Sequence, residues 1–539
     1  MALIREPDSN SPPQLPARAS VSSDLPTSDI PRPASSALPR RSASLLYPVA
    51  LTLVVIASYV RFLNAGFAGT DSLPLIETSR VLSWSDLLQQ LRQPVMAGTL
   101  FTSGELIYRP VVSLTFALDY LIWGLDAVGY HITNLIFHLV TTLAVFGILR
   151  GLSLAAWSSF LGAAVFALHP IVAAAVPVIA RRDNLVSAAP FCLALVCVMR
   201  AQGRAAPLWT AAAVVLFALA LLSKEMAFGA APLVPLVAFG AVATRSDSRR
   251  ALATGVRVAL LFGLTTVAIF GLRFAVLGAL GGYSGTGAIS QPNGELYRHI
   301  LVTFARFLFW PFRDVFPAGS IGWLVAPAAL LALLLVASTR FPKRIGIPVA
   351  IGCLWLAEFA LFYAALKTFT GAWYLYFALP GAAMLVAVLL EWSVGVLGSG
   401  VRSRAGLPAA LSLGGTSVFA AAVLVTSPLI QPYDAWLVDG AASARYLGAV
   451  LECARAAPDG SVLTFARVPD YLDYADNMQT ELLTPTLVFE HTLTSFFRLA
   501  LPGRPLQVVV EGYNHIRSPD HLAVSCDQTP NGRAITASS

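Results

Sequence analysis

The stretch GYHITNLIFHLVTTLAVFGIL, residues 129–149, decides the class of fold. It carries no Asp, Glu, Lys or Arg and shows no period-two alternation. A run of about 20 apolar residues crosses a hydrocarbon layer about 30 Å thick as a helix. Similar runs recur along the chain, in which 56% of residues are hydrophobic and only 12% are charged. Soluble proteins carry about 25% charged residues, so we infer that most of this chain faces lipid or protein.

The apolar runs predict about eleven transmembrane helices, because continuous Leu, Ala, Val and Phe stretches are typical of helices and not of membrane β-strands. The eleven runs lie near residues 44–63, 129–149, 155–179, 184–200, 207–222, 226–243, 255–277, 320–339, 346–366, 374–392 and 407–428.

Basic residues gather at alternate junctions between these runs. They include Arg40, Arg150, Arg200, Arg245, Arg340 and Arg402. Short cytoplasmic loops are enriched in Lys and Arg, so this pattern predicts a cytoplasmic N-terminus and an extracytoplasmic C-terminal segment. The same topology accounts for the net charge of +7 without a nucleic-acid partner.

The chain therefore divides into three regions, and the expected fold class is an all-α polytopic membrane protein with a small C-terminal α/β domain. Residues 1–42 are rich in Pro and Ser and predict a disordered cytoplasmic tail. Residues 43–429 form the transmembrane domain, with long outer loops at 65–128 and 278–318. Residues 430–539 predict an extracytoplasmic domain with strands at SVLTFARV and LQVVVEGY and helices around 435–455 and 484–500.

Two further helices are predicted in the outer loops. RPVVSLTFALDYLIWG, residues 109–124, has the pattern of a helix lying along the membrane interface. A second, aromatic and Arg-bearing helix is expected around 296–312.

Cys453 and Cys526 both lie in the predicted extracytoplasmic domain and could form a disulfide if that compartment is oxidising. The sequence contains no compact carboxylate cluster of the kind that holds a divalent cation, so we expect neither a metal ion nor a cofactor.

Polar side chains that break the apolar pattern carry the functional signal, because such groups are costly at membrane depth. They are Asp71, Tyr108, Arg109, His131, Asn134, His169, Arg181, Arg182, Asp183, Lys224, Glu225, Tyr374 and Tyr376. On the predicted topology, almost all of them lie at the outer membrane face.

Their chemistry suggests the transfer of a sugar from a lipid phosphate. Arg109, Arg181, Arg182 and Lys224 can bind a phosphate, to which Arg offers a bidentate fork. Asp71 can remove a proton from an acceptor hydroxyl. Fixed cations would stabilise the charge that develops on the leaving lipid phosphate.

Simpler explanations exist for each group by itself. Asp71 fits an ordinary solvated loop carboxylate, and Arg181 and Arg182 fit arginines that extend toward water from a helix end. Lys224 and Glu225 fit a local ion pair. The polar side chains of 129–149 share a helix face and fit interhelical hydrogen bonds, and the tyrosines near residue 375 fit an interfacial aromatic belt.

Four segments together resemble a known group of proteins. They are YRPVVSLTFALDYLIWGLDAVGYHITNLIFHLV, ALHPIVAAAVPVIARRDNLVSA, ALLSKEMAFGAAPLVPL and WYLYFALP. In this order they resemble the transmembrane O-mannosyltransferase-like proteins that often carry tetratricopeptide repeats, which belong to the GT-C superfamily of membrane glycosyltransferases. The resemblance covers roughly residues 50–390.

The resemblance implies a GT-C fold, a polyprenyl-phosphate-linked sugar donor and no divalent ion. It implies a catalytic acidic residue in the first outer loop, which corresponds to Asp71, and places Arg109, Arg182 and Lys224 near the donor phosphate. Where the group usually has an acidic pair, this chain has Thr70 and Asp71, so Glu77 is a second choice for the base.

Two further departures concern other segments. Trp373 replaces the arginine that usually precedes YLY, and residues 430–539 are too short and too strand-like for a repeat array.

We therefore predict an inverting membrane glycosyltransferase of the bacterial inner membrane. It would move a sugar from a polyprenyl-phosphate donor to an acceptor of unknown identity at the outer face. Two alternatives remain open from the sequence: a transporter or flippase of lipid-linked sugars, and a non-catalytic scaffold.

Overall fold

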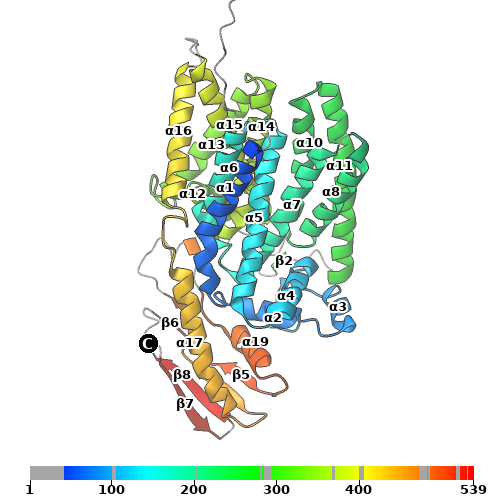
Figure 1. Ribbon diagram of the computed structural model, residues 1–539. Helices are drawn as coiled ribbons and strands as arrows, with labels where there is room; N and C mark the ends of the chain where they lie inside the picture. The colour runs from blue at the N-terminus through cyan, green and yellow to red at the C-terminus, as the bar shows by residue number, and fades with distance from the viewer. Residues whose placement is uncertain are drawn as a thin grey trace, which may run out of the picture. The chain divides into compact units, whose positions relative to one another are not determined.

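The computed structural model describes residues 42–99, 105–201, 203–278, 282–283, 294–366, 371–399, 406–472, 482–483, 486–516, 523–530 and 532–538. The predicted tail, residues 1–42, and the Gly-rich stretch after residue 278 lie almost wholly outside these ranges. Within Ser44–Ser539, a bundle of long helices carries a small strand-containing domain at one end (Figure 1).

Nine stretches of the described chain are helical, long and apolar enough to span a membrane, which confirms a multi-pass membrane protein. They contain α1 Ser42–Tyr59, α5 Ala127–Gly151, α6 Ala156–Leu168, α7 Arg182–Arg200, α8 Ala206–Leu221, α11 Ser248–Leu277, α14 Lys343–Leu366, α15 Leu379–Gly398 and α16 Gly406–Val425. The predicted runs at 226–243 and 320–339 form the shorter apolar helices α10, Leu233–Ala243, and α13, Gly322–Ser338.

Burial separates the central helices of the bundle from the peripheral ones. The span that includes α7 is 89% buried, whereas those of α11 and α16 are each 11% buried. A helix that is apolar on all sides yet exposed within the protein has its remaining surface available to lipid. The central position of α7 explains why polar side chains at its start meet several other elements.

At two places a predicted run is interrupted where a proline lies in the first turn of the next element. The run 155–179 breaks after Leu168, where the 3₁₀ helix η3, Pro170–Ala174, begins. The run predicted from residue 374 is the 3₁₀ helix η8, Ala372–Phe377, followed by α15 with Pro380 in its first turn. Proline has no backbone N–H and is tolerated mainly at the first turn of a helix.

The first outer loop contains α2 Ser72–Ser79, α3 Trp84–Gln90 and α4 Pro110–Trp123. The helix predicted at 109–124 is therefore confirmed as α4. Strand β1, Glu105–Leu106, pairs antiparallel with β2, Gly282–Tyr283, and so ties the two predicted outer loops together. The helix predicted around 296–312 is α12, Gly294–Leu308, followed by the 3₁₀ turn η7, Trp310–Phe312.

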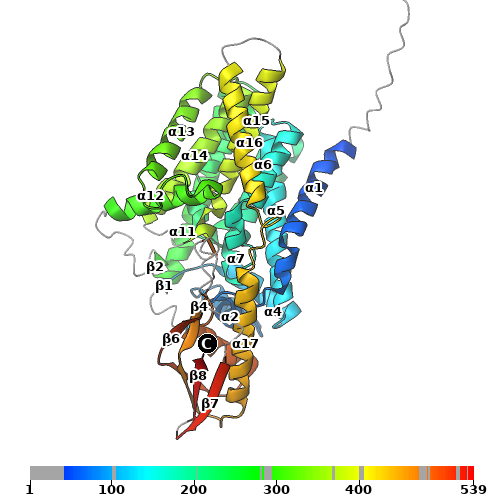
Figure 2. The ribbon, with the colours of Figure 1, turned by 90° about the vertical axis from the view of Figure 1, so that its left-hand side faces the viewer.

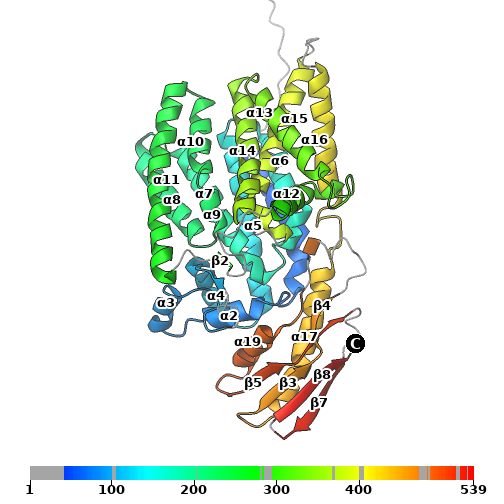
Figure 3. The ribbon, with the colours of Figure 1, turned by 180° about the vertical axis from the view of Figure 1, so that it is seen from behind.

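The C-terminal region is an α/β domain, as predicted. Its elements are α17 Ala435–Arg455, β3 Val462–Ala466, β4 Val468–Leu472, α19 Glu490–Ala500, β5 Gln507–Val510, β6 Tyr513–Ile516, β7 Ala523–Thr529 and β8 Gly532–Ser538. The main sheet has the order β5-β3-β8-β7; β3 is parallel to both neighbours, and β7 is antiparallel to β8. The strands, α17 and α19 lie at one end of the bundle, near α2 (Figures 1 and 3).

Several of the predicted cytoplasmic basic residues meet at the opposite end of the bundle. Arg245 donates to the Ser153 hydroxyl at 3.1 Å and to the Gly151 carbonyl at 2.8 Å, and Arg344 donates to the Ser153 carbonyl at 3.0 Å. The start of α1 lies at this end, and the C-terminal domain lies at the other (Figure 2). The side of the membrane that each end faces stays a prediction of the basic-residue pattern.

Candidate active site

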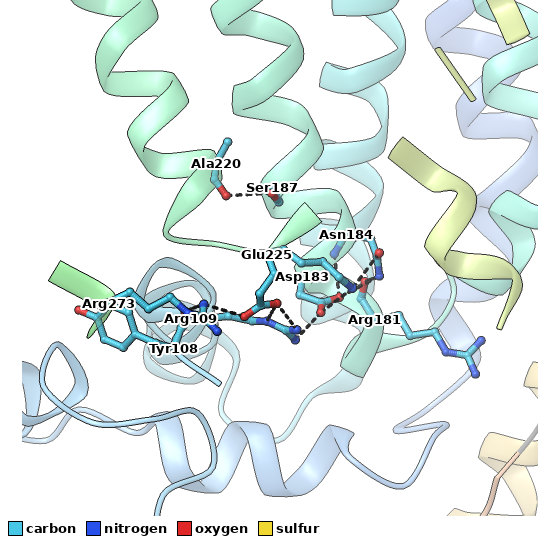
Figure 4. A network of polar contacts seen from close by, with 10 residues as sticks. Tyr108, Arg109, Arg181, Asp183, Asn184, Ser187, Ala220, Glu225 and Arg273 are labelled. Atoms are coloured by element: carbon cyan, nitrogen blue, oxygen red, sulfur yellow. Dashed lines mark hydrogen bonds and ion pairs between the residues drawn. The ribbon is translucent and has the colours of Figure 1, made fainter. Parts of the chain in front are cut away.

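Two carboxylates hold together four segments at the end of the bundle that faces the C-terminal domain (Figure 4). Arg109, which precedes α4, donates to Asp183 Oδ2 at 2.6 Å and to Glu225 Oε2 at 2.6 and 3.0 Å. Asp183 lies in the first turn of α7, and Glu225 precedes the short helix α9, Met226–Gly229. Arg109 therefore bridges the first outer loop to the start of α7 and to the segment between α8 and α9.

Two more cations complete this network. Lys224 Nζ lies 2.8 Å from Asp183 Oδ2 and 2.9 Å from Asn184 Oδ1. Arg273, near the end of α11, donates to Glu225 Oε1 at 2.8 Å. Lys224 and Glu225 thus have different partners, so the local ion pair between them is not formed. Arg273 was not among the predicted site residues, although it is the only charged residue in the last fifteen residues of α11.

Among the described residues of this network, three cations, Arg109, Lys224 and Arg273, face two carboxylates, Asp183 and Glu225, so these five side chains together carry excess positive charge. Burial raises the pKa of Glu225, but Arg109 and Arg273 lower it by more, and the net pKa lies well below its usual range. Glu225 is therefore ionised at neutral pH. Excess positive charge in a partly desolvated site favours the binding of an anion.

Arg181 points away from this network, toward the C-terminal domain (Figure 4). It donates to the carbonyls of Ala174 at 2.6 Å and Leu483 at 3.1 Å. Its guanidinium lies 3.6 Å from the Trp373 ring centroid and 5.0 Å from that of Trp436. Trp373, which replaces the arginine expected from the resemblance, therefore stacks on another arginine.

Within the described part of the chain, Arg181 forms no ion pair, although its charge is within electrostatic range of Asp71 and Asp183. A guanidinium without a carboxylate partner retains donors for a ligand. The charge of Arg181 is thus within electrostatic range of both the predicted base, Asp71, and Asp183 of the cationic network.

Arg182 is in a different environment from its neighbour. Its side chain is 0% exposed and forms an ion pair with Asp119 of α4 at 2.6 Å. It also donates to Asn134 Oδ1 at 2.8 Å and to the Tyr130 carbonyl at 2.9 Å. The structure thus places Arg182 in the interior between α4, α5 and α7, apart from the other predicted phosphate-binding residues.

Asp71 immediately precedes α2 and has a side chain that is 43% exposed. Its Oδ1 accepts from His491 Nε2 at 3.1 Å and from the Thr70 hydroxyl at 3.4 Å. Among the described residues, no hydrogen bond reaches its Oδ2. Glu77, the second choice for the base, has an 11% exposed side chain and lies 3.7 Å from Arg80 and 3.8 Å from Arg498.

The remaining polar residues of the central helices mainly join elements to one another. His131 contacts the Gly66 carbonyl at 2.8 Å, and His138 contacts the Tyr376 hydroxyl at 2.8 Å. Asn134 donates to the carbonyls of Val176 and Val178. These contacts join α5 to neighbouring segments without a ligand, although only His138 meets another helical element, η8; His131 and Asn134 contact turns instead.

Three other predicted site residues make separate contacts. His169 contacts the Leu308 carbonyl at 3.0 Å, which joins the break after α6 to α12. The Tyr374 ring lies 5.0 Å from Lys224 Nζ. Tyr108 donates to the Leu91 carbonyl at 2.8 Å, and burial raises its pKa.

Cys453 of α17 and Cys526 of β7 are both free thiols in the structure, and their side chains are in contact. Burial, followed by the hydrogen bond with Cys526, raises the pKa of Cys453 to about 12. The proximity makes the predicted disulfide geometrically reasonable, and the pairing stays a prediction.

Comparison with protein-family models gives no match for this chain. Among curated proteins, the chain is 33% identical over 137 residues to the protein O-mannosyl-transferase Tmtc1 of Drosophila melanogaster, a match that covers 25% of this chain and 16% of that protein. It is 33% identical over 177 residues to the human protein O-mannosyl-transferase TMTC3, covering 32% of this chain and 19% of that protein. The matched segments thus span less than a fifth of these relatives.

Among solved structures, ArnT from Cupriavidus metallidurans bound to undecaprenyl phosphate aligns with a TM-score of 0.46 at 16% identity, over 93% of this chain and 98% of ArnT. The Archaeoglobus fulgidus oligosaccharyltransferase in its apo form aligns with a TM-score of 0.40 at 14% identity, over 76% of this chain and 60% of that one. The resemblance to O-mannosyltransferase-like proteins that the motifs indicated is confirmed by the curated relatives.

Proposed function

We propose that this protein is a membrane glycosyltransferase that moves a sugar from a polyprenyl-phosphate donor to a hydroxyl acceptor at the extracytoplasmic face of a bacterial inner membrane. The observation that carries the proposal is an exposed carboxylate, Asp71, within electrostatic range of Arg181, whose guanidinium forms no ion pair with the described residues and which is close in sequence to Asp183 of the network with excess positive charge. The similarity to protein O-mannosyl-transferases supports the same class of reaction.

In the proposed reaction, Asp71 is the general base. Its Oδ2 accepts the proton of the acceptor hydroxyl as that oxygen attacks the anomeric carbon of the sugar. The bond between this carbon and the phosphate oxygen breaks, and the lipid phosphate leaves with the electron pair. Attack from the side opposite the phosphate inverts the configuration at the anomeric carbon.

Arg181 and Lys224 are the proposed contacts of the donor phosphate, and Arg109 holds Asp183 and Glu225 so that the cationic groups stay in place. Donors fixed before the reaction stabilise the developing charge without reorganisation. In this proposal Arg182 positions the start of α7 from the interior and does not touch the donor.

Native mass spectrometry of the detergent-purified chain tests the donor class. A retained polyprenyl-phosphate sugar, identified by mass, supports it. Each of Arg181→Gln and Lys224→Gln removes one charge-assisted hydrogen bond worth about 1.5–3 kcal/mol, so donor retention should weaken about 10- to 100-fold.

Arg61→Gln is the matched control for Arg181→Gln, because Arg61 also donates to two backbone carbonyls, those of Pro428 and Gln431. Equal losses in Arg61→Gln and Arg181→Gln would contradict the assignment. A preparation that retains only ordinary phospholipid would contradict the donor class.

A turnover assay tests the base. Asp71→Asn should abolish transfer while donor retention survives, and Asp86→Asn in the same loop should transfer normally. Loss of transfer in Glu77→Gln with an active Asp71→Asn would assign the base to Glu77. Donor movement across the membrane without glycan turnover would instead favour a transporter.

A further inference from the structure

The loop that carries Asp71 is held by the C-terminal domain at three consecutive residues. The Gly69 N–H donates to Asp439 Oδ2 of α17 at 3.2 Å. The Thr492 hydroxyl of α19 donates to the Thr70 carbonyl at 2.8 Å, and His491 contacts Asp71 itself. The C-terminal domain therefore contacts residues 69, 70 and 71 one after another, which is more than a simple tether to the bundle requires.

His491 is itself held in a fixed orientation. Its ring stacks on Phe489 with a centroid separation of 5.9 Å and an interplanar angle of 17°. Phe489 in turn packs against Tyr513 of β6, with ring centroids 5.2 Å apart. The His491 Nε2–H can therefore donate to Asp71 Oδ1 from a constant direction, and among the described residues no hydrogen bond occupies Oδ2.

His491 also lines a cavity of about 310 Å³. Its polar lining includes Thr99 from the first outer loop and Glu490, His491, Thr494 and Arg498 from α19. The spacing of the α19 residues places them on one helix face. The opposite face of α19 carries buried apolar side chains, among them Leu493 and Phe497, which pack into the domain core.

This lining suits an acceptor that presents several hydroxyl groups. Hydroxyls both donate and accept hydrogen bonds, so a site for a sugar needs acceptors and donors together. Glu490 supplies a carboxylate, Arg498 a guanidinium and Thr494 a hydroxyl. The volume falls at the small end of small-molecule sites, which span about 300–1,000 Å³.

We propose that α19 forms the acceptor site for a glycan and that His491 is a positioning residue that orients the carboxylate of Asp71 toward the acceptor hydroxyl. This inference rests on the proposed function. It gives the C-terminal domain a role in the reaction, because the domain both receives the acceptor and aligns the base.

Transfer kinetics of the full-length, donor-loaded protein test the proposal, with methyl mannoside as a glycan probe and a threonine-containing tripeptide amide as a peptide probe. His491→Ala should lower kcat about 10- to 100-fold, because small displacements of a catalytic group have effects of this size. His491→Gln retains an N–H donor and should restore most of the rate. Thr494→Val and Arg498→Gln should raise KM for methyl mannoside, about 10-fold for the charged residue, with little change in kcat.

His515→Ala is the matched control, because His515 contacts Asp470 at 2.7 Å in the same domain but away from α2. It should leave kcat and KM unchanged. Donor retention measured by native mass spectrometry should be normal in all of these variants, which separates an acceptor defect from a donor defect.

Transfer to the peptide probe alone would overturn the glycan assignment. A normal kcat in His491→Ala, or equal losses in His491→Gln and His491→Ala, would overturn the positioning role. If wild type retains no donor and transfers to neither probe, the proposed function itself fails.

Discussion

Removal of one partner of the Arg182–Asp119 pair should strongly destabilise the protein. The two side chains are 0% and 4% exposed, and their charged atoms lie 2.6 Å apart. Arg182→Met leaves the Asp119 carboxylate buried without its cation, and Asp119→Leu leaves the guanidinium without its anion. Breaking a buried ion pair from one side costs about 3–5 kcal/mol, because the remaining charge stays desolvated.

This cost converts into an expected shift of the unfolding temperature. The unfolding entropy is about 2.1 cal/mol/K per residue, or about 1 kcal/mol/K for a unit of about 500 residues. Each single variant should therefore lower Tm by about 3–5 °C in a thermal melt of the detergent-purified protein. The double variant Arg182→Met/Asp119→Leu leaves no unpaired charge. Its decrease in Tm should therefore be much smaller than the sum of the decreases of the two single variants.

Arg455→Ala serves as the control for this cycle. Arg455 pairs with Glu452 at 2.7 Å, but the two side chains are 55% and 72% exposed, and exposed pairs contribute about 0–1 kcal/mol. The Tm of Arg455→Ala should stay within about 1 °C of the wild-type Tm. The reasoning would be refuted if the single variants of the buried pair had the same Tm as Arg455→Ala. It would also be refuted if the decrease in Tm of the double variant equalled the sum of the decreases of the two single variants.

Three further predictions concern other parts of the molecule. Gly440→Ala should weaken the packing of α17 on the bundle, because an added Cβ would lie 1.7 Å from the Ala65 carbonyl oxygen; Gly448→Ala, which meets no atom within 4 Å, should melt like wild type. The pKa of Glu225 is lowered in the folded state, so its contribution to stability is present above its usual pKa of 4.5 and is lost as the pH falls below that value. The Tm difference between wild type and Glu225→Gln should therefore narrow below about pH 4.5, and a constant difference between pH 7 and pH 3 would argue against it. A Cys453–Cys526 disulfide should form under oxidising conditions and add about 4 kcal/mol to the stability of the domain by closing a loop of about 70 residues, and two alkylatable thiols in the unreduced protein would contradict it.

The membrane architecture was largely predictable from the sequence. Continuous apolar runs are local signals, because any segment that crosses lipid must satisfy its own backbone and present apolar side chains. The strands of the C-terminal domain and the bounds of α17 were likewise predictable from periodicity. The errors occurred at His169-Pro170 and before Pro380, where the apolar character continues although the helix does not.

The sequence also identified most of the polar residues from which the candidate site is built, since they stand out against an apolar background, but it missed Arg273 of α11. It could not assign their partners. Arg181 and Arg182 are adjacent and chemically identical. Arg181 contacts two tryptophan rings and is within electrostatic range of Asp71, whereas Arg182 is buried in an ion pair with Asp119. Successive residues at the start of a helix point in different directions, so only the packing of α4, α5 and the C-terminal domain decides which guanidinium meets which partner.

Tertiary structure alone brought His491 to Asp71, across 420 residues of sequence. A lone histidine in a polar domain carries no local signal of such a contact, because its chemistry depends on what the fold places beside it. The amino-acid sequence thus determined that this chain crosses the membrane repeatedly and collects cations at one face. The fold decided which of these cations are neutralised, which remain available to a ligand and which domain aligns the carboxylate.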